Sequence, residues 1–405
     1  MRATGRTSSR PRAGSNGRAN YNMLLDGKRL DRVSGSSPHR SLSCNVVPVN
    51  PRPKRLRGWR GFKDMTVIRT QRVADEVTAV WLQALDGGNL PDYLPGQHIT
   101  VQTNDPVSGE QLIRCYSLVG SAIEEGRKTY QIAVRFVPRP HDRPDLPGGR
   151  MSTVMNRHLA VDHKIQVQAP SGHFVIPAES TRPIVLVAGG IGITPMISHL
   201  ETIATLPHQP RVHLVYANRS RETEAFADRL TRLQARMPSL TITRLWGAGE
   251  DELPYGVRVG FAGVADVHLD DFKEHPEVYL CGPPPMTAAL RKALIAAGHS
   301  SELVFEEAFT AAQVDVTKLP EGPFKVTFAK SDKTVIWKRE NGSLLELAEA
   351  QGIKITNGCR AGQCESCEVR ILGGECTHRI EVNHDGDETC LACQAVPTAD
   401  LLIDA

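Results

Sequence analysis

Six of the nine cysteines lie within 35 residues of one another near the end of the chain. Cys359, Cys364 and Cys367 have the spacing Cys-x4-Cys-x2-Cys, and Cys390 and Cys393 follow in a second short segment. One loop with this spacing and a later fourth cysteine is the arrangement in which four thiolates hold a [2Fe–2S] cluster. Clustered cysteines in a long chain without an apolar secretory segment also favour metal ligation over disulfides.

Other metal sites fit these cysteines less well. Zinc sites usually pair two short Cys-x2–4-Cys knuckles, which differ from x4 followed by x2 in one loop. The segment Cys376-Thr377-His378 begins like a Rieske motif, but a second Cys-x2-His is absent because Cys390-Leu-Ala leads to Cys393. We therefore expect Cys376 to be non-ligating, with Cys390 and Cys393 as rivals for the fourth ligand position.

Two glycine-containing turns could bind a dinucleotide. The segment GGIGITP (189–195) lies between an apolar run and a helical stretch. Glycines there let the backbone approach a pyrophosphate, and the helix N-terminus offers unpaired N–H donors. Pro195 stands where the ordinary fingerprint has its third glycine, so this motif alone is only moderately specific. A second turn, CGPP (281–284), ends a later strand, and ligands bind at loops that follow parallel strands.

Two upstream segments could bind a flavin. The segment RCYS (114–117) lies among alternating strand-like residues, and GGRMS (148–152) follows it. Arginine can pair bidentately with a phosphate, tyrosine can lie against an isoalloxazine ring, and serine can donate a hydrogen bond to it. Taken alone, Arg-x-Tyr-Ser is a weak motif that also occurs in ordinary strands.

The elements that must position these residues form three units. Residues 61–180 contain alternating β-branched segments such as MTVIRTQRV and YQIAVRFV, which predict an antiparallel β-barrel or sandwich. In residues 181–310, apolar runs such as PIVLVAG and VHLVYA alternate with helical stretches, which predicts an α/β domain with a parallel sheet. Residues 311–322 are a predicted linker, and 323–405 form a small α+β unit with the cysteine cluster.

Charge is unevenly distributed along the chain. The formal net charge is +3, but residues 1–60 carry 14 Lys and Arg against two Asp, so residues 61–405 are acidic by nine charges. An acidic body argues against nucleic acid as a partner. The longest apolar run is too short and too interrupted by glycine for membrane insertion. We predict that residues 1–60 are a disordered basic tail of a cytoplasmic protein, or a transit peptide for import into mitochondria.

Together these motifs resemble those of oxygenase-type flavin reductases of the ferredoxin–NADP reductase superfamily, such as phthalate dioxygenase reductase and vanillate demethylase reductase. The resemblance covers about residues 61–405 and six motifs in order: R-x-Y-S, G-G-x-x-S, G-G-x-G-x-T-P, C-G-P, E-x-F and the four cysteines. It implies a flavin-binding β-barrel, an NAD(P)-binding α/β domain and a plant-type ferredoxin domain with a β-grasp fold. The family motif ends as Cys393-Gln394-Ala395 does, which favours Cys393 as the fourth ligand.

The resemblance also implies roles for individual residues. The implied cluster ligands are Cys359, Cys364, Cys367 and Cys393. The implied flavin-binding residues are Arg114, Tyr116, Ser117, Leu118, Gly149, Met151 and Ser152, with Glu307 and Phe309 closing over the flavin. The implied nucleotide-binding residues are Gly190, Gly192, Thr194, Cys281, Gly282 and Pro283. Thr194 and Cys281 are the implied catalytic residues, with a positioning role rather than an acid–base role.

Two cofactor choices stay open. Cys115 is an unusual residue within the flavin motif, although the segment SGHF (171–174) favours FAD over FMN. Asn218 follows the strand VHLVYA where an acidic residue would hold the ribose 2′-hydroxyl of NADH. Ser220 and Arg221 could pair with the 2′-phosphate of NADPH, but arginines at a helix start are common.

The expected function is an NAD(P)H-dependent oxidoreductase that passes electrons through a flavin to the cluster, and then to a terminal oxygenase. Two alternatives remain: a non-oxygenase acceptor such as a molybdenum-cofactor or hybrid-cluster protein, and a redox-sensing regulatory flavoprotein. Residues 323–405 carry nine basic and thirteen acidic side chains, so we expect this unit to dock on a basic face of its acceptor.

Overall fold

A computed structural model describes residues 58–59, 61–140, 148–177, 180–247, 257–309, 314–362, 364–380, 382, 384 and 388–405. Residues 1–57 of the predicted basic tail, which include Cys44, and the first part of the predicted linker lie outside these ranges. Trp59, at the end of the predicted tail, instead packs against the barrel core and donates its ring N–H to the Val167 carbonyl over 3.0 Å. All described residues belong to one unit, Val46–Ala405.

The first part of this unit is a closed, six-stranded antiparallel barrel with strand order β1-β2-β5-β4-β3-β6. Its strands are β1 (Phe62–Ala74), β2 (Val77–Ala84), β3 (His98–Asn104), β4 (Gln111–Val119), β5 (Thr129–Arg135) and β6 (Lys164–Gln168). Apolar side chains fill the barrel interior, with Val80 and Leu82 of β2 both fully buried. A single helical turn, α1 (Arg150–Thr153), continues into a short π-helix over Val154–His158. The predicted antiparallel barrel is confirmed.

The second part is a six-stranded parallel sheet with order β10-β9-β8-β7-β11-β12. Its strands are β7 (Ile184–Gly189), β8 (Val212–Asn218), β9 (Leu240–Trp246), β10 (Val257–Val259), β11 (Glu277–Cys281) and β12 (Val304–Glu307). Every residue of β7 is buried, as expected for a central strand with helices on both faces.

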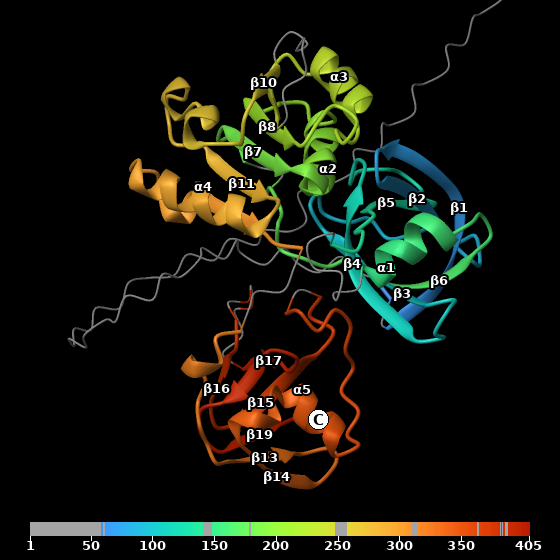
Figure 1. Ribbon diagram of the computed structural model, residues 1–405, viewed down its shortest axis with the longest axis vertical. Helices are drawn as coiled ribbons and strands as arrows, with labels where there is room; N and C mark the ends of the chain where they lie inside the picture. Colours follow the sequence, from blue (N-terminus) through green and yellow to red (C-terminus); the bar gives the residue numbers. More distant parts are fainter. Residues whose placement is uncertain are drawn as a thin grey trace, which may run out of the picture. The chain divides into compact units, whose positions relative to one another are not determined.

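Helices cover both faces of this sheet (Figure 1). The helices α2 (Ile193–Ile203) and α3 (Ala227–Arg236) pack their apolar residues against one face. The helix α4 (Pro284–Ala296) packs Leu290 and Leu294 against the other. Because β8 and β11 lie on opposite sides of β7, the strand order reverses at β7, which creates a crevice at the carboxyl ends of β7 and β11.

The last part is a small α+β unit. A five-stranded mixed sheet has the order β14-β13-β19-β15-β17, and β16 pairs with β18. Its strands are β13 (Phe324–Phe328), β14 (Lys333–Trp337), β15 (Glu368–Gly373), β16 (Cys376–His378), β17 (Thr389–Leu391), β18 (Ala395–Pro397) and β19 (Leu401–Ile403). Helix α5 (Leu344–Ala350) begins with a capping box in which Ser343 and Glu346 bond each other's backbone N–H groups. Its leucines pack on the sheet around the buried Trp337.

None of the helices within the described ranges combines the length and apolar character needed to cross a bilayer.

Candidate functional site

A cavity of about 1010 Å³ collects residues from all three parts of the chain. Its wall includes Arg114 and Ser117 of β4 and Gly149 before α1. Glu307 and Phe309 at the end of β12 also line it. The SGHF segment contributes three residues, and the cysteine loop contributes residues from Asn357 to Gly362. The cavity therefore unites residues that the sequence assigned separately to flavin binding and to the cluster.

A contact between a carboxylate and a hydroxyl in this wall joins Glu307 and Ser117. The Ser117 hydroxyl donates to the Glu307 carboxylate over 3.5 Å, across 190 residues of sequence. Burial raises the pKa of Glu307 to about 8, and the Ser117 hydrogen bond opposes this rise only in part. The carboxyl group is therefore neutral at pH 7 and can donate a proton or a hydrogen bond into the cavity.

The other predicted flavin-binding residues lie in the barrel core or in the turn before α1, next to the cavity wall. Leu118 and Met151 are buried in the barrel core, and Tyr116 packs against that core. The Ser152 hydroxyl donates to the Gly149 carbonyl over 2.7 Å and accepts the Val137 N–H, so it holds the turn before α1 in place. Leu118 and Met151 are therefore part of the barrel core and do not line the cavity.

The two predicted nucleotide loops meet at the crevice between β7 and β11. A methyl group added at Gly192 would lie 2.1 Å from the carbonyl oxygen of Cys281, and one at Gly189 would lie 2.7 Å from Pro283. A methyl group at Gly282 would lie 3.0 Å from the backbone nitrogen of Gly189. Only glycine permits this approach, so the glycine loop and the CGP loop are built to fit each other.

Gly190 and Pro195 explain the unusual form of this motif. Gly190 has φ of +53°, a left-handed conformation that favours glycine, and a methyl group there would lie 4.0 Å from the Arg135 guanidinium. Pro195 lies in the first turn of α2, where backbone N–H groups have no partner within the helix. Proline can therefore replace the third glycine without the loss of a helical hydrogen bond.

The two predicted catalytic residues are both buried. Thr194 is 2 % exposed, and its hydroxyl donates to the Ile191 carbonyl over 3.0 Å. Cys281 is fully buried, and burial raises the pKa of its thiol well above the ordinary value. Both residues lie where the two nucleotide loops join, and neither has the geometry of an acid–base group.

The cysteine loop directs backbone N–H groups at sulfur. The N–H groups of Ala361 and Cys364 donate to the Cys359 sulfur over 3.3 and 3.4 Å, and the Cys359 N–H donates to the Cys364 sulfur over 3.2 Å. A methyl group at Gly358 would lie 2.9 Å from the Cys364 sulfur. Gly362 takes a φ of +72°. Such a nest of N–H donors around thiolates fits an iron–sulfur cluster, whose sulfur atoms carry negative charge.

The later cysteines separate into two pairs. Cys393 lies beside Cys367, and hydrogen bonds from the Cys367 thiol and the Gly362 N–H lower the pKa of its own thiol. The Cys390 thiol is instead hydrogen-bonded to Cys376. Cys393 therefore lies beside the cysteine loop, whereas Cys390 pairs with Cys376.

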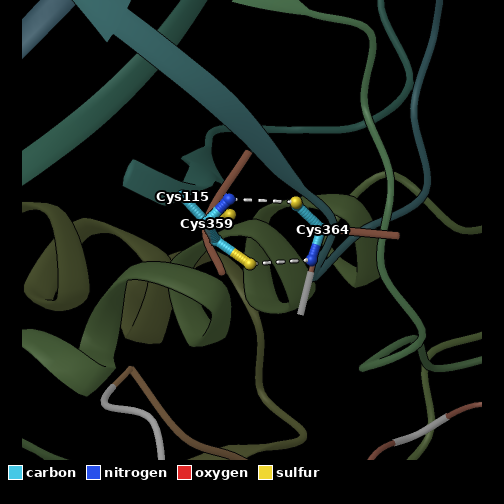
Figure 2. Close-up of side chains that lie close together, drawn as sticks. All are labelled: Cys115, Cys359 and Cys364. Atoms are coloured by element: carbon cyan, nitrogen blue, oxygen red, sulfur yellow. Dashed lines mark hydrogen bonds between the residues drawn. The ribbon is translucent and has the colours of Figure 1, made fainter. Parts of the chain in front are cut away.

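Cys115 joins the cysteine loop from the barrel (Figure 2). The sulfur atoms of Cys115, Cys359 and Cys364 all lie within 4.8 Å of one another, and no other group of this kind occurs among the described residues. Cys115 stands on β4 between two residues of the cavity wall. Sequence reasoning treated it as an odd residue in the flavin motif. A cysteine at that position in a chain that also carries a cluster motif was the available signal.

Two further contacts were not foreseen. His173 of the SGHF segment is hydrogen-bonded to Glu365 beside the cysteine loop. The Ser366 hydroxyl donates to the Gln168 side chain at the end of β6 over 2.6 Å. No local sequence signal marks them, because each partner lies almost 200 residues from the other.

Comparisons with known families account for all three parts. Residues 64–176 match the oxidoreductase FAD-binding domain, 186–292 the oxidoreductase NAD-binding domain, and 328–398 the 2Fe-2S iron-sulfur cluster binding domain. The order of these domains is that of the ferredoxin–NADP reductase superfamily. The chain therefore contains an FAD-binding, an NAD-binding and a 2Fe-2S cluster binding domain in that order. These matches confirm the prediction that the chain binds a flavin, a nicotinamide nucleotide and a [2Fe–2S] cluster.

Individual relatives match one or more of these domains. A component of the 1,2-phenylacetyl-CoA epoxidase from Escherichia coli (strain K12) is 26 % identical over 362 residues, which cover 85 % of this chain and 97 % of that protein. A flavohemoprotein of Bordetella pertussis is 29 % identical over 255 residues, which cover 62 % of this chain. The match spans only 61 % of that flavohemoprotein. The structure of phthalate dioxygenase reductase has a TM-score of 0.54 at 25 % identity, with 85 % of this chain and 98 % of that chain covered.

Proposed function

We propose that this chain is an NAD(P)H-dependent reductase that delivers electrons through a flavin and a [2Fe–2S] cluster to a terminal oxygenase component. One observation carries the proposal. A single cavity is lined by the flavin motif of β4, by the end of β12 in the nucleotide domain, and by the cysteine loop. A flavin bound there would lie between the nucleotide crevice and the cluster cysteines, which is the order in which electrons would travel. The match to the phenylacetyl-CoA epoxidase component, along almost the whole length of that protein, supports an oxygenase system.

The chain's own residues would hold and orient these groups. The bound flavin and cluster together supply the change from a two-electron hydride donor to one-electron carriers. Arg114 would pair with the flavin phosphate, and Ser117 with Glu307 would hold a proton beside the flavin ring. The loops at Gly192 and Cys281 would seat the nicotinamide, with Thr194 fixing the turn. Cys359, Cys364, Cys367 and Cys393 would hold the cluster.

The cofactor choices follow from the same residues. The match to an FAD-binding domain and the SGHF segment in the cavity wall support FAD over FMN. Ser220 lies in a second cavity of about 400 Å³ with Arg72, Arg219 and the acidic Asp75 and Glu76. Arg219 is paired with Glu76 over 2.9 Å, so that arginine is only partly available to a 2′-phosphate. We propose that NADH is used at least as well as NADPH.

Anaerobic rapid mixing of the holoprotein with NADH or NADPH tests this function. Flavin absorbance should fall first, and cluster absorbance should follow within the same turnover. In Cys364→Ser, the flavin should still be reduced, but the cluster signal and the rapid reduction of cytochrome c should be lost. A flavin that is reduced while an intact cluster stays oxidised would contradict the proposed path. Slow turnover combined with redox-dependent complex formation would favour the regulatory alternative instead.

The class of electron acceptor is identified by measuring electron transfer from the reduced holoprotein. We expect the reduced holoprotein to support turnover of an oxygenase component purified from the same cells. Transfer to a molybdenum-cofactor or hybrid-cluster protein, with none to an oxygenase, would replace the oxygenase with the other acceptor class.

A further inference from the structure

Two cysteines of the ferredoxin unit, Cys376 and Cys390, are not needed by the proposed cluster. Cys376 opens β16 and Cys390 lies in the middle of β17. Their thiols are hydrogen-bonded to each other. Both side chains belong to the apolar cluster that fills this unit.

The surrounding backbone holds the two strands in place. The Leu391 N–H, next to Cys390, donates to the His378 ring nitrogen over 3.1 Å, and His378 lies two residues after Cys376. On the other side of β17, Cys390 pairs with Val369 of β15. The two thiols therefore face each other from strands that are already fixed.

The two thiols differ in exposure. Cys390 is fully buried, whereas Cys376 is half-buried and can be reached from solvent. The hydrogen bond with Cys390 lowers the pKa of the Cys376 thiol, which makes Cys376 the better nucleophile of the pair. Such a pair has one attacking and one resolving cysteine.

A second metal site explains this pair less well. Within the described ranges, the one group of three close ligand atoms is Cys115, Cys359 and Cys364. His378 and His384 lie near the pair, but the His378 nitrogen accepts the Leu391 N–H and His384 is bonded to Thr389. The histidines are thus already engaged, and the thiols are left to react with each other.

We propose that Cys376 and Cys390 form a reversible intramolecular disulfide that responds to the thiol–disulfide balance around the protein. A low-molecular-weight disulfide such as glutathione disulfide is the oxidant. The Cys376 sulfur attacks it, which forms a mixed disulfide and releases one glutathione thiol. The Cys390 sulfur then displaces the second glutathione, and the protein disulfide forms. Two protein thiols lose two electrons and two protons, which the two glutathione thiols carry away.

This bond would fasten the segment that carries Cys393, a consequence that rests on the proposed ligand role of Cys393. The Arg379 guanidinium donates to the Cys393 carbonyl over 3.1 Å, and the Arg379 N–H donates to the Gln394 carbonyl over 2.7 Å. Arg379 directly follows β16, and β17 ends two residues before Cys393 in the chain. A covalent link between β16 and β17 would therefore restrain Cys393 from both sides. We expect the oxidised protein to lose iron to a chelator more slowly than the reduced protein.

Disulfide mapping of the holoprotein tests the proposal. The protein is incubated anaerobically in glutathione buffers of increasing disulfide fraction, then denatured in N-ethylmaleimide and digested with trypsin. Cleavage after Arg379 separates Cys376 from Cys390 and Cys393. The expected product joins peptide 371–379 to peptide 380–405 with the loss of two hydrogens, and fragmentation places the link at Cys390. It should disappear in reduced glutathione, be absent from Cys376→Ser and Cys390→Ser, and persist in the control Cys115→Ser.

Three results would overturn the proposal: no linked peptide at any glutathione ratio, a stable glutathione adduct on Cys376 alone, or a link to Cys393. The mapping does not depend on electron transfer. A linked pair in a protein without reductase activity would therefore refute the proposed function and leave the disulfide standing. In the chelator assay, equal rates of iron loss for oxidised wild type and Cys376→Ser would refute the fastening of Cys393.

Discussion

The Glu307 carboxyl group lies at the point where the nucleotide domain reaches the flavin motif. Its pKa is raised to about 8 by burial, so the group is neutral at pH 7 and becomes ionised as the pH rises through 8. Ionisation places a negative charge in the cavity wall. That charge opposes the transfer of further negative charge, as hydride, to a flavin beside it.

We therefore predict a pH-dependent step that Glu307→Gln removes. Between pH 7 and pH 9, the rate of flavin reduction by NADH should fall by roughly three- to tenfold in the wild type, about 0.7 to 1.4 kcal/mol in barrier height. The rate in Glu307→Gln should change little over this range. Glu302→Gln, at an exposed position of the preceding turn, is the control and should follow the wild-type profile. Parallel profiles for all three proteins would remove Glu307 from this role.

A second prediction concerns which sulfur atoms hold iron. Cys115→Ser should keep full iron and sulfide content, because Cys359, Cys364, Cys367 and Cys393 offer four thiolates without it. Cys393→Ser should lose the cluster, and Cys390→Ser should retain it. Iron and sulfide analysis with the visible spectrum measures all three. Loss of the cluster in Cys115→Ser would instead make that thiol a ligand.

Residue types and spacing predicted most of this site, but not its long-range pairs. The four cysteines, the glycine loops and the flavin motif were recognisable because each is a local pattern. The contact between Ser117 and Glu307 joins β4 to β12 and depends on how two domains pack. The contact of Cys115 with Cys359 likewise joins β4 to the cysteine loop, and the unusual cysteine within the flavin motif was its one sequence signal.

At the scale of elements, the glycine loop and the CGP loop pack so closely that a change in one must displace the other. Gly192→Ala would place a methyl group 2.1 Å from the Cys281 carbonyl oxygen, so the loops must separate. We predict a loss of stability of about 1–3 kcal/mol and weaker NADH binding. Urea unfolding and the KM for NADH measure the two effects, while the flavin and cluster spectra should stay normal.

Gly247→Ala is the matched control for Gly192→Ala. A methyl group there makes an ordinary contact of 3.6 Å with the Asn218 carbonyl oxygen, in the same domain. Its stability and KM should stay close to those of the wild type. Equal effects of the two substitutions would mean that any added methyl group disturbs this domain. The close packing of the two loops would then not explain the effect of Gly192→Ala.

Long elements were predictable and short ones were not. Alternation over five or more residues identified the barrel strands, and apolar runs followed by helical stretches identified the parallel sheet. The three-residue strands β16 and β17 carry too few side chains to show a period, so the pairing of Cys376 with Cys390 was not foreseen. The π-helical turn after α1 likewise depends on packing inside the barrel.

At the scale of the whole molecule, the negative charge of residues 323–405 bears on the choice of acceptor. We predict that cytochrome c, a basic protein, is reduced about tenfold more slowly when the NaCl concentration rises from about 50 to about 500 mM, because salt screens the attraction. Reduction of ferricyanide, a small anion, should not slow down. A cytochrome c rate that does not depend on salt would argue against electrostatic docking on this unit.

Strand β4 sets a condition for exchanging parts between reductases. It contributes Arg114 and Ser117 to the cavity, and between them a thiol that contacts the cysteine loop. A chimera that joins this barrel to a foreign ferredoxin unit would have to accommodate that thiol as well as the connecting segment. Position 115 is therefore the place to adjust first when such a fusion binds both cofactors but transfers electrons poorly.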